Sequence, residues 1–232
     1  MDGFTTFGTQ HLVMLGVAAV GLVPAVLVGR TRPDEAARRR TSRVLAVVLV
    51  VVLVPLQTLG FLGGRYDVDT TLPLQLCDLA SLAAVVALWT HHRYAVGLTY
   101  YWGLLMTTQG LLTPALDTGF PSVAFVGFWA LHLLVVWSAV HLTWGVRLPP
   151  TWREYGTTVA TTLVWAGAVY LLNDAAGTNY GFLERKPEGS VLDVLADWPT
   201  YLAQLAVIVL LLWALMTLPW TVVRRRRSRQ PA

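Results

Sequence analysis

Long apolar runs, separated by short clusters of arginine, proline and glycine, dominate this chain of 232 residues. Only 13% of the residues are charged, which is about half the charged fraction of a soluble globular domain. A helix that crosses a bilayer needs about 20 mostly apolar residues. The sequence therefore predicts an all-α fold, a polytopic membrane bundle of seven transmembrane helices in a single domain over residues 1–232. The predicted spans are residues 10–29, 44–63, 72–90, 94–115, 121–145, 155–174 and 198–222.

The basic residues between these spans are distributed unevenly. Fourteen of the 17 Lys and Arg residues are arginines in the first, third and fifth connections and in the C-terminal tail, whereas Arg65, Arg185 and Lys186 fall elsewhere. Loops rich in basic residues remain in the cytoplasm. The pattern predicts a multi-pass protein of the plasma membrane with an external N-terminus and a cytoplasmic C-terminus. The arginine clusters are expected to contact anionic lipid, and this interpretation leaves no need for a nucleic-acid partner.

A few polar side chains lie inside the predicted spans, where they are costly and usually face the bundle interior. The third span opens with the sequence LPLQLCDLAS. Within it Cys77, Asp78 and Ser81 share an arc of about 100° on a helix. The fifth span places His132 at mid-membrane depth. These side chains are the first candidates for a functional site.

The fourth span adds a second polar group near its outer end. Thr108 and Gln109 are adjacent, and Gln109 and Thr113 are four residues apart, which puts them on one face of a helix. These three residues are candidates for binding or orienting a substrate. Three further histidines lie near the predicted cytoplasmic edge and are interpreted as interfacial; they are His91, His92 and His141.

Cys77 and His132 suggest nucleophilic catalysis. A cysteine nucleophile needs a base to take the thiol proton, particularly in apolar surroundings. His132 can supply that base, and Asp78 or Gln109 can orient its imidazole, as the third member does in other nucleophile–base–orienter sets.

Each of these residues also has a structural interpretation. A free cysteine often packs as a small hydrophobe, and Asp78 or His132 can simply form a hydrogen bond between helices. A zinc site is the weaker chemical alternative, because no pair among the cysteine, the aspartate and the histidine has the spacing typical of ligands. We therefore expect no metal and no cofactor.

The longest predicted external loop, residues 175–197, is a candidate substrate-binding segment. Asn179, Tyr180, Arg185 and Lys186 lie in it, and either of the two cations can hold a phosphate head group. The segment that begins at Ser190 starts like a capping box, which predicts a short helix on the outer surface that acts as a lid.

These motifs resemble those of the YwaF-type bacterial integral membrane proteins, which are similar to the eukaryotic transmembrane protein 164 family. The resemblance covers nearly the whole chain. It rests on the sequences LPLQLCDL (72–79), YWGL (101–104), QGLLTP (109–114), GFP (119–121), NY (179–180), FL (182–183), KP (186–187) and WPTY (198–201), together with His132. It implies phospholipid acyl transfer through a cysteine and a histidine, and these roles fall on Cys77 and His132.

We therefore expect a membrane-embedded lipid acyltransferase, transacylase or hydrolase that uses a Cys77 thioester, with membrane phospholipid as its substrate. Its site would face the outer half of the bilayer, out of reach of cytosolic acyl-CoA. Two alternatives remain open at this stage. One is a non-catalytic protein that binds or transports a small molecule or lipid, and the other is a structural or regulatory membrane subunit.

Overall fold

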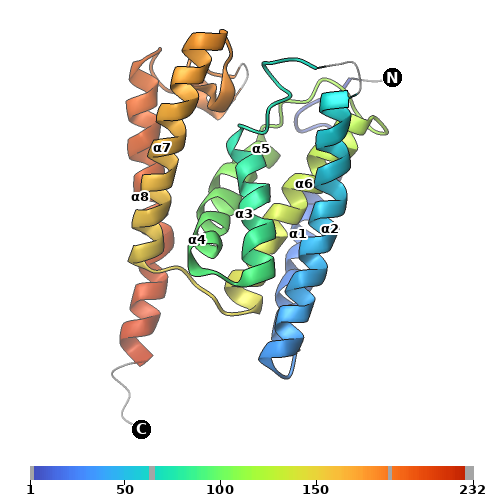
Figure 1. The fold of residues 1–232 in the computed structure, drawn as a ribbon, viewed down its shortest axis with the longest axis vertical. Coiled ribbons are helices and arrows are strands. Elements are labelled where there is room, and N and C mark those ends of the chain that lie inside the picture. The colour runs from blue at the N-terminus through green and yellow to red at the C-terminus, as the bar shows by residue number, and fades with distance from the viewer. Residues whose placement is uncertain (1–2, 63–65, 188–189, 228–232) are drawn as a thin grey trace. The chain divides into compact units, whose positions relative to one another are not determined.

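The computed structural model describes residues 3–62, 66–187 and 190–227, with the side chains of residues 191 and 227 left out (Figure 1). Arg65 and Arg229, which belong to the charge pattern, and the last residue of the predicted span 44–63 lie outside these ranges. The described residues form helices and loops, with one isolated antiparallel bridge between Gly3 and Thr118. Contacts divide the chain into two compact units, residues 1–148 and 149–232, and each is described separately. A single domain stays a prediction.

The described residues of unit 1, which comprises residues 1–148, form five continuous helical segments. The first three are α1 (Thr9–Arg30), α2 (Glu35–Leu62) and α3 (Leu76–Thr90). The fourth joins α4 (Arg93–Tyr101), the π-helical turn η1 (Trp102–Thr107) and α5 (Thr108–Leu112), and the fifth joins α6 (Val123–Val140) to the π-helical turn η2 (His141–Gly145). Within this unit α3 packs against α2, α4, η1 and α6.

Unit 2, residues 149–232, is built on two long helices that pack against each other, α7 (Trp152–Ala176) and α8 (Thr200–Arg227). Thr151 begins α7 with a capping box, in which its hydroxyl accepts from the Arg153 N–H and Glu154 accepts from the Thr151 N–H. Gly177, with φ of +69°, ends the helix in the left-handed conformation that glycine favours. Two 3₁₀ turns, η3 (Tyr180–Phe182) and η4 (Val191–Val194), lie in the connection to α8.

Among the described residues, five helices are long and apolar enough to cross a membrane: α1, α2, α6 with η2, α7 and α8. Two further segments occupy the predicted spans 72–90 and 94–115 but fall short of that standard. One is α3, which has 15 residues and begins at Leu76 because the backbone of Gln75 is still extended. The other is the α4–η1–α5 segment, in which every residue from Ala95 to Tyr101 is buried.

The spanning helices of unit 1 differ in how much protein covers them. The apolar stretch of α1 is 6% buried and that of α2 is 11%, whereas that of α6 with η2 is 56% buried. Valine and leucine side chains left exposed on α1 and α2 are costly in water and stable against lipid. The polar residues that form a site therefore lie inward, on α3, η1 and α6.

Glycines allow the backbones of α1 and η2 to come into direct contact. A Cβ built on Gly29 would lie 2.6 Å from the carbonyl carbon of Gly145, and one built on Gly145 would lie 3.1 Å from the Ala25 carbonyl oxygen. Ala25 and Gly29 are four residues apart and both buried, which is the small-residue spacing that lets membrane helices pack closely. No larger side chain fits this contact.

Gly29→Ala is therefore expected to destabilise the protein by about 1–3 kcal/mol, because the added methyl group meets backbone that has no rotamer to change. Gly16→Ala on the same helix is the matched control, since nothing lies within 4 Å of its Cβ position. Thermal unfolding of the two purified variants in detergent measures the difference. Equal stabilities would contradict the close contact.

Candidate active site

Cys77 and His132 line the same small cavity inside unit 1. The volume of this cavity is about 20 Å³, which is room for one water molecule or little more. Three helical segments contribute its wall: α3 through Cys77, Asp78 and Ser81, η1 through Thr107, and α6 through Leu131, His132 and Val135. The cavity thus brings together side chains from the predicted third, fourth and fifth spans.

The first turn of α3 presents Cys77. Gln75 is the N-cap, so Cys77 is the second residue of the helix and its thiol is free and half-buried. The N–H groups of a first turn have no acceptor within the helix and favour negative charge nearby. Ser81, one turn further on, donates from its hydroxyl to the Cys77 carbonyl at 2.9 Å.

Asp78 has a local role in the same turn. Its Oδ2 accepts a hydrogen bond from the backbone N–H of Gln75 at 3.1 Å, the carboxylate half of a capping box. Asp78 is thus used to begin α3, although it also lines the cavity. The group that orients the imidazole of His132 lies on α6 itself.

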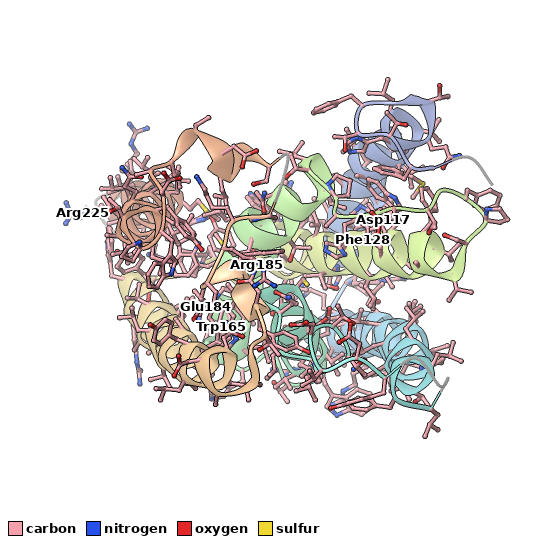
Figure 2. All side chains as sticks on the ribbon, turned by 90° about the horizontal axis from the view of Figure 1, so that it is seen from above. Asp117, Phe128, Trp165, Glu184, Arg185 and Arg225 are labelled. Atoms are coloured by element: carbon pink, nitrogen blue, oxygen red, sulfur yellow. The ribbon has the colours of Figure 1, made fainter. Side chains whose placement is uncertain are left out.

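The backbone of α6 fixes the orientation of His132. The Nδ1 atom lies 2.8 Å from the Phe128 carbonyl oxygen, and because a carbonyl only accepts, Nδ1 carries the proton. The Phe128 ring stacks on the imidazole, with centroids 3.9 Å apart and planes inclined by 25°; Figure 2 labels Phe128 on α6. In the neutral ring the basic lone pair is therefore on Nε2.

The π-helical turn beside the cavity brings α5 close to this nitrogen. A Cβ built on Gly110 would lie 3.3 Å from both Nε2 and Cδ2 of His132. Thr107, the last residue of η1, donates to the Trp102 carbonyl five residues earlier at 3.2 Å. Turns of this kind are frequent at functional sites, and the sequence offered no sign of this one.

The three polar candidates of the fourth span bond within their own helix. The Nε2 amide of Gln109 donates to the Thr113 hydroxyl at 2.9 Å, and the Thr108 hydroxyl lies 3.5 Å from the Gly103 carbonyl oxygen. Among the described residues of this segment, their neighbour Thr107 lines the cavity, and Thr108, Gln109 and Thr113 do not. A part for Thr108, Gln109 or Thr113 in substrate binding stays a prediction.

In unit 2 the four loop candidates fold the connection after α7. The Asn179 side chain accepts from the backbone N–H groups of Glu184 and Arg185 at 3.1 Å and donates to the Arg185 carbonyl. Tyr180 is fully buried and bonds through its backbone to Asn173. Lys186 donates to the Leu195 carbonyl at 3.0 Å. The Arg185 side chain is exposed, so it is the member of this group that best suits a ligand.

A short helix follows in the same connection, as predicted from Ser190. It is the 3₁₀ turn η4, in which the Ser190 hydroxyl accepts from the Leu192 N–H. Figure 2 labels Trp165 of α7 together with Glu184 and Arg185 of the loop; a Cβ on Gly181 would collide with the Trp165 ring. The function of this segment as a lid stays a prediction.

The sequence model of the TMEM164 family matches residues 6–217. The chain belongs to the TMEM164 family. Its family and its apolar helices make it an integral membrane protein. No curated protein and no solved structure gives a match.

This TMEM164-family protein also contains a buried polar cluster that the sequence analysis missed. Ser42 of α2 bonds to Nε2 of His141 at 3.0 Å and to Nε2 of His91 at 2.9 Å. His141 and Ser42 are fully buried and His91 is 8% exposed, whereas His92 is exposed. The interfacial placement of the three histidines stays a prediction. The hydrogen-bond partner of His91 and His141, Ser42, is far away in the sequence, so no local pattern predicted this cluster.

His91 lies between α3 and α4, where burial lowers its pKa. The charges of Arg39 and Arg43 add to this effect, as does His141, whereas Glu35 opposes it. His91 is therefore neutral at pH 7, and it links the arginine-rich end of α2 to the interior of unit 1. No group of three or more His, Cys, Asp or Glu residues with metal-binding geometry occurs in the part of the chain that the structure describes.

The hydrogen bond from His132 to Phe128 predicts the tautomer of His132. Nitrogen NMR of the purified protein, labelled with ¹⁵N-histidine, is expected to show a neutral ring with the proton on Nδ1 and an unprotonated Nε2. His132→Gln assigns the signal by removing it, and His92→Gln, which changes an exposed histidine, leaves it in place. A proton on Nε2 at neutral pH would exclude the carbonyl as acceptor.

Proposed function

We propose that this TMEM164-family protein is a membrane-embedded lipid acyltransferase, transacylase or hydrolase that uses Cys77 as nucleophile and His132 as base. One observation carries the proposal: the thiol and the imidazole line a common cavity, and the Nδ1 atom of His132 is bonded to a carbonyl, so Nε2 is the basic atom. Nucleophilic catalysis requires a basic atom near the nucleophile that can take its proton. No metal or cofactor is part of the proposal.

The surroundings of Cys77 explain why a base is needed. The N-terminus of α3 favours a thiolate, but the neighbouring Asp78 carboxylate opposes it. Attack by the sulfur therefore needs a partner that accepts the thiol proton. His132 is suited to do so because its position is held by the Phe128 carbonyl and by ring stacking rather than by another ionisable group.

The reaction divides into two transfers. Nε2 of His132 takes the thiol proton while sulfur attacks the ester carbonyl of a phospholipid. Collapse of the tetrahedral intermediate breaks the ester C–O bond, and the imidazolium returns its proton to the departing lysolipid oxygen, which leaves an acyl thioester on Cys77. An acceptor hydroxyl then loses its proton to Nε2 and attacks the thioester. The acyl chain passes to the acceptor, or to water in a hydrolase, and the thiol is restored.

Donors for the oxyanion are available near the sulfur. The N–H groups in the first turn of α3 lie closest in sequence, although that of Asp78 already donates to the Gln75 carbonyl at 3.0 Å. Gln109 or Thr108 would likewise have to give up its present bond within the helix. The cavity of about 20 Å³ is too small for an ester group. The proposal therefore includes a widening of the space between α3, η1 and α6 when substrate enters.

Trapping the thioester tests the chemistry. The purified protein is incubated with a phospholipid that carries a labelled acyl chain, and the label on protein is released with hydroxylamine. Cys77→Ala, which removes the only thiol of the chain, is expected to abolish label and turnover. His132→Gln is expected to slow acylation by about 10²-fold or more, the usual loss on removing a general base. His92→Gln, an exposed histidine, controls for histidine substitution.

Two outcomes would contradict the proposal. Full turnover in Cys77→Ala excludes the cysteine as nucleophile, and full-rate labelling of Cys77 in His132→Gln excludes the histidine as its base. If wild type and Cys77→Ala bind phospholipid equally and neither forms a thioester, the alternative of a non-catalytic lipid-binding or lipid-transporting protein is favoured.

We further propose seven spans in the plasma membrane, with the N-terminus outside and the C-terminus cytoplasmic. Support comes from the five long apolar helices and from α3 and the α4–η1–α5 segment, which occupy the two remaining predicted spans. Fourteen arginines lie in every second connection and in the C-terminal tail, as expected for the cytoplasmic side. This topology puts the beginning of α3, and with it Cys77, towards the outer leaflet. The exposed Arg185 is proposed to contact a phosphate head group on the same side.

The topology predicts the acyl donor. A site that opens outward cannot use cytosolic acyl-CoA, so the purified protein is expected to transfer acyl chains from phospholipid and to leave acyl-CoA unused. Both donors are compared at equal concentration in the same detergent, with Cys77→Ala as the blank. Efficient use of acyl-CoA would contradict an outward-facing site, as would a cytoplasmic location of an epitope inserted in the loop before α3.

A further inference from the structure

A second, larger hollow lies on unit 1, between α2 and the end of α3. Its volume is about 610 Å³, within the range of small-molecule sites. It is lined by Trp89 of α3 and by residues of α2 from Ala36 to Val48, two helices that pack side by side (Figure 1). None of these residues lines the cavity of Cys77. We call this hollow the α2–α3 groove.

One end of the groove is cationic. Arg39, Arg40 and Arg43 line it. Arg39 is held by Glu35 at 2.9 Å and by the Thr90 carbonyl at 3.2 Å, and the guanidinium of Arg43 lies 5.6 Å from the centre of the Trp89 ring. The exposed Arg40 has no hydrogen-bond or ion-pair partner among the residues that the structure describes. Guanidinium groups in this arrangement suit a phosphate, which they bind in a bidentate manner.

The other end of the groove is apolar. Val44, Val47 and Val48 line it, with 57%, 49% and 42% of their surfaces exposed. They are the first valines of a helix that is long and apolar enough to span the membrane, so acyl chains of lipid are their natural neighbours. Trp89, 49% exposed at the junction of the two ends, fits the interfacial depth at which tryptophan gathers.

We propose that the α2–α3 groove binds one anionic phospholipid, with its phosphate head group on the three arginines and an acyl chain along the valines. The order of charges and apolar side chains along α2 matches the order of head group and chain in a lipid. A free phosphate would use the arginines but gain nothing from the valines. The site does not depend on the chemistry proposed for Cys77.

Two matched pairs of variants test this site in the purified full-length protein. Arg40→Gln removes a groove charge, and Arg32→Gln removes an exposed charge of the same basic segment outside the groove. Val47→Trp fills the groove without altering any charge, and Val51→Trp makes the same change one turn further on at a 64% exposed position that does not line it. All four sites are exposed or half-exposed, so the fold should tolerate the changes.

Native mass spectrometry in detergent measures the binding of phosphatidylglycerol, of phosphatidylcholine and of inorganic phosphate. Wild type is expected to bind one phosphatidylglycerol in preference to phosphatidylcholine, and inorganic phosphate weakly. Arg40→Gln should weaken phosphatidylglycerol binding about fivefold, the effect of one cation near an anionic lipid, and Val47→Trp should weaken it at least as much. Arg32→Gln and Val51→Trp should retain wild-type affinity.

If Arg40→Gln and Arg32→Gln lose the same phosphatidylglycerol affinity, or if Val47→Trp binds like wild type, the binding is due to general surface charge. Either result would contradict a lipid site in the groove. Inorganic phosphate that binds as tightly as phosphatidylglycerol would overturn the assignment to lipid. A protein dimer that Val47→Trp dissociates and Val51→Trp does not, without any lipid preference, would assign the groove to a second copy of the chain instead.

Discussion

In the hydrocarbon core of a membrane every backbone N–H and C=O group must be satisfied within the protein, and this constraint shapes the whole chain. It accounts for an architecture of helices and short connections in the described residues. It also explains how the site is built. His132 uses the carbonyl of Phe128, an acceptor that its own helix provides, and Asp78 and Ser81 bond to backbone groups of the turn that carries Cys77.

The imidazole of His132 is therefore held without a second ionisable group. In soluble nucleophile–base sets a carboxylate often holds the imidazole, and burying that second charge in a membrane is expensive. A neutral carbonyl and a stacked phenyl ring hold His132 at lower cost. The orientation of the proposed nucleophile and base therefore depends on helix geometry, and the proposed widening of the site would require only small shifts of α3 against α6.

Much of this could be predicted from the sequence, because the length of an apolar run and the rarity of polar residues within it are local properties. Cys77 and His132 stood out for that reason. The hydrogen-bond acceptor of His132 did not, because it is a backbone carbonyl and every residue has one. The cluster of Ser42, His91 and His141 was missed for a related reason. Its members lie near the ends of the predicted spans, where polar residues are common, and only the packing of α2 against its neighbours buries them.

The short helix α3 shows a further limit of hydropathy. Leu72 to Leu74 are apolar enough to extend the run, yet the chain stays non-helical until Leu76. Had the helix begun at Leu72, Cys77 would lie in its second turn, away from the N–H groups of the helix start.

The π-helical turn η1 has a consequence for how this protein can evolve. A turn with i to i+5 bonding accommodates one residue more than an α-helical turn. If the same residues were wound as a regular α-helix, everything after them would rotate by about 100°, and the face of α5 that carries Gly110 would turn away from His132. Deleting one residue lets the stretch close into a regular α-helix with Gly110 still on that face, so a single-codon deletion here would be less damaging than one elsewhere in the segment.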